Sequence, residues 1–91
     1  MILGQGTAQT DDELFAEYDQ FLQTTGRTTT SCVGKRLHGA PGAMQRRIGK
    51  PVLEWTDEDI LQLYAGRQPA TWYVYSAFLA FLFFRGYRRA F

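Results

Sequence analysis

One segment near the end of the chain limits what this protein can fold into. Residues 69–84 contain no charged side chain and are rich in Phe, Tyr and Trp, and basic residues follow them. A helix that spans a membrane needs roughly 20 apolar residues, so this shorter segment predicts the central core helix of a small globular domain. Because a chain of 91 residues can surround such a helix only incompletely, we expect part of its apolar surface to remain exposed.

The pattern within this segment predicts which side of the helix is buried. Pro69 suits the first turn of a helix, and Gly86 suits the position just beyond its end. One stripe at helical spacing is predicted to face the core, and it consists of Trp72, Tyr75, Leu79, Leu82 and Phe83. Four more aromatic residues fall largely outside that stripe, namely Tyr73, Phe78, Phe81 and Phe84.

Two other helices have clear start signals. Residues 10–13, Thr-Asp-Asp-Glu, have the capping-box pattern and predict a helix over about residues 11–25. Thr56 is followed by three acidic residues, which favour the positive end of a helix dipole. Trp55 and Ile60 flank this cap at the spacing of a hydrophobic staple, so the sequence predicts that they pack together across it.

The middle of the chain is predicted to be less regular. A second helix is expected over about residues 29–38. Residues 38–42 contain two glycines and a proline, which predicts a break, and a short helical piece follows at 43–48. Residues 52–53 are expected to form a short extended anchor, and residues 1–9 a disordered tail. Since the sequence shows no strand-like alternation, the predicted fold class is all-α with four principal helices.

The polar residues exclude several kinds of site. With one cysteine, Cys32, and one histidine, His38, the chain cannot form an internal disulfide or complete a four-ligand zinc site. We therefore predict no metal and no cofactor, and we interpret His38 as a helix-end or surface histidine. No acidic pair accompanies a base, which argues against a free-standing enzyme. The first residues resemble neither a signal nor a transit peptide, so we expect a cytoplasmic protein without a membrane segment.

Charged residues alternate in blocks along the chain. Residues 1–25 carry five acidic side chains, 26–50 six basic ones, 51–66 four acidic ones and 67–91 four basic ones. The net charge of +1 therefore conceals a strong separation of charge. A fold that brings the two basic blocks to one side has a basic face that suits an anionic partner.

Several motifs recur in the same order in one known family. The third helix is entered by Gly49-Lys-Pro-Val-Leu-Glu-Trp-Thr-Asp-Glu-Asp-Ile60, and the fourth opens at Ala70-Thr71 and ends in Phe83-Phe84-Arg85-Gly86. Thr28 stands at the opening of the second helix. Over roughly residues 12–88, this order resembles the N-terminal core-binding domain of the tyrosine recombinases, the phage-integrase family.

The resemblance implies a SAM-like orthogonal bundle of four helices that docks on duplex DNA. Residues 10–88 are then the core-binding domain, which forms half of a clamp, and residues 89–91 begin a linker to a separate C-terminal catalytic domain. The implied function is to clamp DNA for integration or recombination, with no catalytic residue in this chain. The implied partners are duplex DNA, that catalytic domain and other recombinase protomers on the DNA.

The candidate DNA-binding residues are hydroxyls at helix starts and cations of the basic blocks. Hydroxyls and helix N-termini commonly anchor phosphates, and Lys and Arg release counterions. The family usually has more basic and polar residues on the DNA side of the fourth helix, where this chain has Val74, Ala77 and Ala80. We therefore predict contacts at Thr28, Thr30, Lys35, Arg36, Arg46, Arg47 and Thr71, with Arg67, Arg85, Arg88 and Arg89 as a second group.

A second interpretation is a helical module that binds another protein through its aromatic last helix. Replacement of Lys35 and Arg36 by Glu separates the two interpretations. It is expected to abolish DNA binding and to leave an aromatic interface intact.

Overall fold

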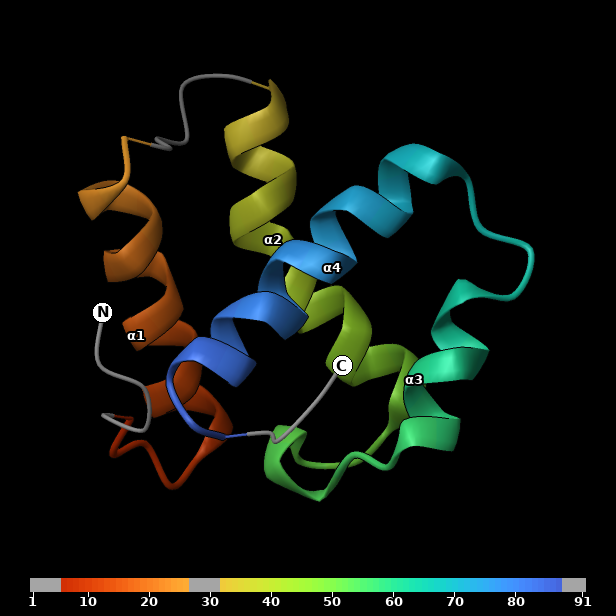
Figure 1. Ribbon diagram of the computed structural model, residues 1–91, viewed down its shortest axis with the longest axis horizontal. Helices are drawn as coiled ribbons and strands as arrows, with labels where there is room; N and C mark the ends of the chain where they lie inside the picture. Colours follow the sequence, from red (N-terminus) through yellow and green to blue (C-terminus); the bar gives the residue numbers. More distant parts are fainter. Residues whose placement is uncertain (1–5, 27–31, 88–91) are drawn as a thin grey trace.

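Four helices account for most of the chain that the computed structural model describes, which is residues 6–26 and 32–87. They are α1 (Asp11–Thr24), α2 (Cys32–Ile48), α3 (Asp57–Tyr64) and α4 (Pro69–Phe84), with a 3₁₀ turn, η1 (Val52–Glu54), before α3. No strand occurs in these ranges, so the predicted all-α class is confirmed. α4 lies in front of α2, between α1 and α3 (Figure 1).

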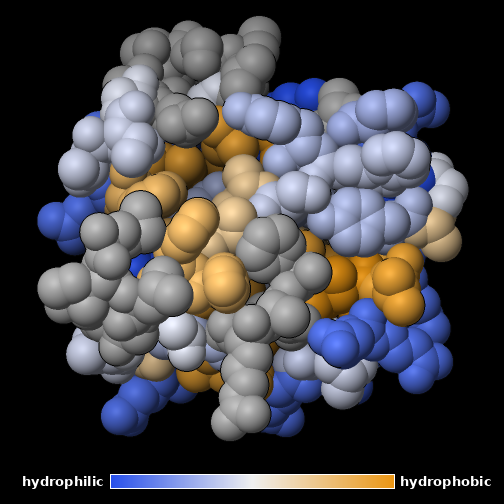
Figure 2. Space-filling model, viewed as in Figure 1, coloured by the Kyte–Doolittle hydropathy of each residue, from blue (hydrophilic) through white to orange (hydrophobic). Residues whose placement is uncertain are grey.

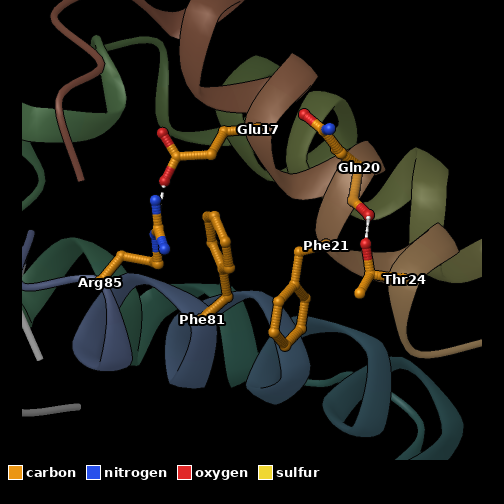
Figure 3. A pocket seen from close by; sticks show the side chains of 6 residues that line it. All are labelled: Glu17, Gln20, Phe21, Thr24, Phe81 and Arg85. Atoms are coloured by element: carbon orange, nitrogen blue, oxygen red, sulfur yellow. Dashed lines mark hydrogen bonds and ion pairs between the residues drawn. The ribbon is translucent and has the colours of Figure 1, made fainter. Parts of the chain in front are cut away.

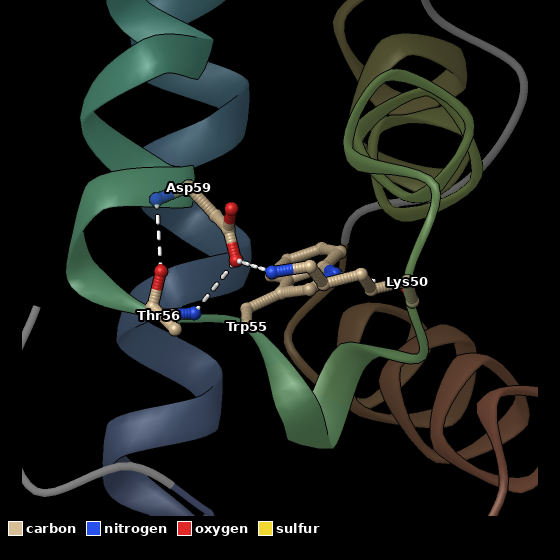
Figure 4. Close-up of polar contacts among 4 residues, drawn as sticks. All are labelled: Lys50, Trp55, Thr56 and Asp59. Atoms are coloured by element: carbon tan, nitrogen blue, oxygen red, sulfur yellow. Dashed lines mark hydrogen bonds and ion pairs between the residues drawn. The ribbon is translucent and has the colours of Figure 1, made fainter.

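The helix starts follow the local capping rules. Thr10 Oγ1 accepts from the Glu13 amide at 3.2 Å, while the Glu13 carboxylate accepts from the Gln9 amide, also at 3.2 Å. At α3 the box is complete, because Thr56 Oγ1 accepts from the Asp59 amide at 3.1 Å and Asp59 Oδ2 accepts from the Thr56 amide at 2.9 Å (Figure 4). Both predicted starts are confirmed.

The predicted break at residues 38–42 is wrong, because α2 continues through Pro41 to Ile48. A proline inside a helix costs about 3 kcal/mol through the lost N–H and the clash with the preceding turn. Leu37, Met44 and Pro41 are fully buried on the inner side of α2. Burial of each large apolar side chain contributes about 1.5–3 kcal/mol, so the two offset the cost of the proline.

The prediction for the buried side of α4 is confirmed for Tyr75, Leu79 and Leu82 and is wrong for Trp72. Phe78 and Phe81 are buried, with exposed fractions of 0% and 1%, whereas Trp72 is 42% exposed. Phe78 and Phe81 pack against Tyr18 of α1 with ring centroids 4.9 Å apart in each pair. The aromatic core therefore lies where α4 crosses α1 and α2. The expectation that α4 keeps an uncovered apolar side is confirmed, because Tyr73 and Phe84 are exposed.

The first described residues pack against the end of α4 and are not a frayed tail. The Gly6 amide donates to the Arg85 carbonyl at 3.0 Å, and the Ala8 amide donates to the Tyr87 hydroxyl at 2.9 Å. A Cβ on Gly6 would overlap the Tyr87 ring. The two ends of the described chain therefore lie side by side.

The predicted extended anchor at residues 52–53 is instead the first part of η1. The Val52 amide donates to Asp11 Oδ1 at 2.9 Å, and the Val52 side chain is buried. This contact joins the turn before α3 to the first turn of α1.

Candidate nucleic-acid interface

The candidate interface is the exposed side of α2. Lys35, Arg36, Arg46 and Arg47 are all exposed there, and none has a hydrogen bond or ion pair with another described residue. The structure describes seven Lys and Arg side chains in total. These four cations are both exposed and unpaired, whereas Lys50 and Arg85 have carboxylate partners and Arg67 is half-buried.

The continuity of α2 places these four cations on one side of the helix in two pairs. Lys35 and Arg36 form the first pair, and Arg46 and Arg47 form the second. Lys35 and Arg46 are eleven residues apart, as are Arg36 and Arg47. Eleven residues make three helical turns plus about 20°, so each residue of the first pair has its counterpart on the same side of the helix, about 16 Å further along the axis. An uninterrupted α2 thus gives one basic face, which the predicted break had concealed.

Small residues separate the two pairs. Gly39, Gly42 and Ala43 lie on the same side of α2, and a Cβ on Gly39 would meet no atom within 4 Å. A Cβ on Gly42 would lie 3.3 Å from Arg46 Nη1, so the Arg46 guanidinium folds over that glycine. The backbone at Gly39 is therefore open to close approach by a partner, whereas Arg46 partly covers Gly42. We did not predict these three residues as part of a site, although their spacing to Lys35 and Arg46 in a continuous helix indicates it.

Two other cations are neutralised by carboxylates. Lys50 Nζ lies 3.0 Å from Asp59 Oδ2, and Arg85 Nε donates to Glu17 Oε1 at 2.7 Å (Figure 3). The backbone hydrogen bond from Thr56 and the bond from Lys50 lower the pKa of Asp59. Arg85 projects from the end of α4 toward α1, so the structure does not bring it together with the basic face of α2.

The Glu17 carboxylate has a second partner. The Tyr87 hydroxyl donates to Glu17 Oε2 at 2.8 Å. Burial raises the pKa of Tyr87, and the contact with Glu17 raises it further, against the opposing effect of the Ala8 amide. Arg85, Tyr87 and Glu17 thus form a structural cluster at the end of α4.

The remaining predicted contacts lie near the start of α4. Arg67 is half-buried, its Nε has no hydrogen-bond partner in the described structure, and it lines a pocket of about 280 Å³ together with Arg47. Thr71 is half-buried in the first turn of α4, where its amide donates to the Gln68 carbonyl at 2.9 Å. Arg67 therefore adjoins the basic face, while the Thr71 amide is already engaged. Thr28, Thr30, Arg88 and Arg89 lie outside the described residues.

His38 occupies a different position from the one predicted. It lies inside α2, its side chain is largely buried, and its Nδ1 lies 2.9 Å from Asp19 Oδ1 of α1. It therefore links two helices and is neither a helix-end nor a surface residue. Among the described residues, no group of three or more His, Cys, Asp and Glu side chains is placed to hold a metal ion.

None of the helices in the described ranges combines the length and the apolar character that crossing a membrane requires. Comparisons of the chain with models of protein families, with curated proteins and with solved structures found no match.

Proposed function

We propose that this chain is a DNA-binding domain that holds duplex DNA through the exposed side of α2. The observation that carries the proposal is the set of four unpaired cations on that side, Lys35, Arg36, Arg46 and Arg47. Unpaired cations on one face neutralise phosphates and release counterions, which is the main source of affinity for nucleic acid. The motifs between Gly49 and Gly86 support the more specific proposal that the domain is the core-binding domain of a tyrosine recombinase, with the chemistry in a separate domain.

The spacing of the cations suits a duplex. The two pairs are separated by about 16 Å along α2, and the major groove of B-DNA is about 12 Å wide. With α2 across this groove, long side chains from one pair reach each phosphate strand. Gly39 and Ala43 between the pairs offer no side-chain donor or acceptor to a base. The surface therefore positions the domain on DNA and contributes little to sequence recognition.

The charged residues next to α2 define where the proposed DNA-binding surface ends. Arg67 lines the same pocket as Arg47, so it extends the basic surface toward the start of α4. Asp57 and Glu58 are exposed at the start of α3 and repel phosphate. Asp59 of the same turn lines the pocket with Arg47 and Arg67 and is paired with Lys50. The proposed duplex therefore lies along α2, and the start of α3 bounds it beside Arg47.

The dependence of binding on salt tests the proposal. If four phosphates are neutralised, the affinity for a labelled duplex falls with a log–log slope of about −3.6, or roughly 100-fold between 50 and 200 mM salt. Replacement of Lys35 and Arg36 by Gln is expected to reduce the size of this slope by about 1.8. Fluorescence anisotropy over a salt series measures both values.

A control with the same net charge separates contact from overall charge. Gln20→Glu with Gln23→Glu changes the net charge by as much as the Lys35 and Arg36 replacements do, but on exposed positions of α1. This control is expected to keep nearly the full slope. Equal losses in the two double variants, or an affinity that does not depend on salt, would contradict the proposal.

A further inference from the structure

A groove lies between α1 and α4, outside the basic face. It encloses about 410 Å³, and its lining contains no charged side chain. α4 contributes Tyr73, Ala77, Ala80 and Phe84, and α1 contributes Phe21 among others. Figure 2, in the same view as Figure 1, shows apolar surface on this front side of the molecule. Surfaces depleted of charge and enriched in aromatic residues are typical of the centres of protein interfaces.

The residues that α4 contributes to the groove are spaced symmetrically about the midpoint between Ala77 and Ala80. Ala77 and Ala80 form its middle, with Tyr73 four residues before Ala77 and Phe84 four residues after Ala80. Residues four apart lie on the same side of a helix. If the direction of α4 is reversed about this midpoint, each aromatic residue therefore takes the place of the other aromatic residue, and each alanine takes the place of the other alanine.

We propose that this groove binds a second copy of the chain, with the two α4 helices antiparallel about a twofold axis. A twofold interface needs a surface that complements itself. With the axis midway between Ala77 and Ala80, each Ala80 faces the Ala77 of the partner, and each Tyr73 faces the Phe84 of the partner. Small residues at the crossing allow the helix axes to approach to about 8 Å, and the aromatic residues close the two ends.

The exposed aromatic area sets the strength of this interface. Phe21, Tyr73 and Phe84 are 38%, 51% and 40% exposed. At about 200 Å² for each side chain, they contribute roughly 250 Å² per copy and roughly 500 Å² per dimer. This is the apolar centre of an interface below the roughly 1,600 Å² of a stable complex. The dimer is therefore expected to be weak and reversible.

Self-association and DNA binding use different sides of the molecule. The groove is lined by the buried Phe81 and by Tyr73, Ala77, Ala80 and Phe84, which lie on the side of α4 opposite Tyr75, Leu79 and Leu82. The cations lie on the side of α2 away from its own buried residues. The dimer therefore does not depend on the proposed DNA binding.

Sedimentation of the full chain from about 10 µM to about 1 mM tests the dimer. The unmodified chain is expected to show a reversible monomer–dimer equilibrium. Ala80→Glu buries an unpaired charge opposite the partner's Ala77 and is expected to weaken the dimer by at least roughly 10-fold. Leu61→Glu, on the exposed side of α3, is the matched control and is expected to leave the equilibrium unchanged.

Mixing two variants identifies the occupant as a second copy. Ala77→Lys alone is also expected to be monomeric, whereas an equal mixture of Ala77→Lys and Ala80→Glu pairs the opposite charges and restores dimers. Thermal melts confirm that each variant is folded. If Ala80→Glu does not fold, Tyr73→Lys at a more exposed position replaces it in the test for loss of the dimer, and Phe84→Glu is its partner in the mixture. A chain that stays monomeric at about 1 mM overturns the proposal and leaves the groove to a different protein. A dimer that Ala80→Glu leaves intact, or that the mixture fails to restore, overturns it as well.

Discussion

Arg85 and Glu17 join the end of α4 to the middle of α1, with Arg85 Nε donating to Glu17 Oε1 across 2.7 Å. The two residues are 68 positions apart in the sequence. The Tyr87 hydroxyl donates to the other oxygen of the same carboxylate at 2.8 Å. A single acidic side chain on α1 therefore holds both the last helix and the residues that follow it.

Loss of the Glu17 charge is expected to destabilise the fold without affecting the proposed DNA-binding surface. Glu17→Gln weakens two charge-assisted hydrogen bonds in a partly exposed setting, which costs about 1 kcal/mol. The melting midpoint is expected to fall by roughly 4–8 °C. Glu54→Gln removes the same charge from an exposed position without an ion pair and serves as the control. Equal shifts in the two variants would show that the cluster contributes nothing.

Gly39 is predicted to be a position where a side chain stabilises the protein. It lies inside α2, and an added Cβ meets no atom within 4 Å. Gly39→Ala is therefore expected to raise the free energy of unfolding by about 0.5–1 kcal/mol, as measured by urea denaturation. Gly42→Ala is the comparison, because its Cβ lies 3.3 Å from Arg46 Nη1 and displaces that guanidinium. A destabilising Gly39→Ala would contradict a continuous α2.

A longer side chain at Gly39 is expected to separate stability from DNA binding. Gln is a good helix former, so Gly39→Gln also keeps α2 intact. It projects between the two pairs of cations, where the proposed duplex comes closest, and is expected to weaken binding by roughly 10-fold, or about 1.4 kcal/mol. Anisotropy titrations of the Ala and Gln variants under one salt condition make the comparison. Unchanged binding in Gly39→Gln would place the DNA elsewhere.

Trp55 and Thr56 are predicted to differ in their importance for folding. The Trp55 ring is buried, stands edge-on to Phe78 and donates from Nε1 to the Lys50 carbonyl at 3.0 Å. Trp55→Ala is expected to cost about 3–5 kcal/mol, against a total stability of about 5–9 kcal/mol for a domain of this size. Thr56→Ala loses only a cap, at about 1 kcal/mol. Circular dichroism melts are expected to show a partly unfolded Trp55 variant and a folded Thr56 variant.

The Thr56 variant also tests the orientation on DNA. It is expected to bind DNA as the unmodified chain does, because the acidic side chains beside Thr56 repel phosphate and are not expected to contact the proposed duplex. Lost binding with an unchanged melting curve would place that turn at the interface.

Acid is expected to weaken the start of α3 through Asp59. The fold lowers the pKa of this carboxyl, mainly through the hydrogen bond from the Thr56 amide and then through Lys50. Its stabilising contribution is therefore complete above the unfolded value of about 3.9, and it is lost as the pH falls through the lower folded value. Asp59→Asn is expected to flatten the fall of the melting midpoint below about pH 4, whereas Glu58→Gln in the same turn keeps it. Identical pH profiles for all three proteins would contradict this assignment.

Local signals predicted the helix starts but not the course of α2. A cap such as Thr10 or Thr56 acts within three residues, so its partner is visible in the sequence. Whether the helix continues through Pro41 depends on the helices that pack around it. The burial of Leu37 and Met44 outweighs the local preference of proline for a helix break. A helix boundary predicted at a proline does not take this stabilisation by tertiary packing into account.

Two further errors have related causes. α4 is apolar nearly all round, so its periodicity does not distinguish Phe78, which is buried, from Trp72, which is exposed. The pairing of Arg85 with Glu17 joins distant segments, and a count of charges by block does not show which charges meet. Four of the eleven predicted contact residues nevertheless form one face, because α2 carries them together.

The contact between the two ends of the described chain has a kinetic consequence. The bond from the Ala8 amide to the Tyr87 hydroxyl joins residues 79 positions apart, so forming it in an unfolded chain would close a loop of almost the whole chain at a cost in conformational entropy. A contact of this kind forms late, after the helices have packed, and it contributes little to the folding transition state. Tyr87→Phe removes this bond and the one to Glu17, so it is expected to accelerate unfolding and to leave the folding rate nearly unchanged. The Tyr87 hydroxyl thus controls how long the native state persists once it has formed.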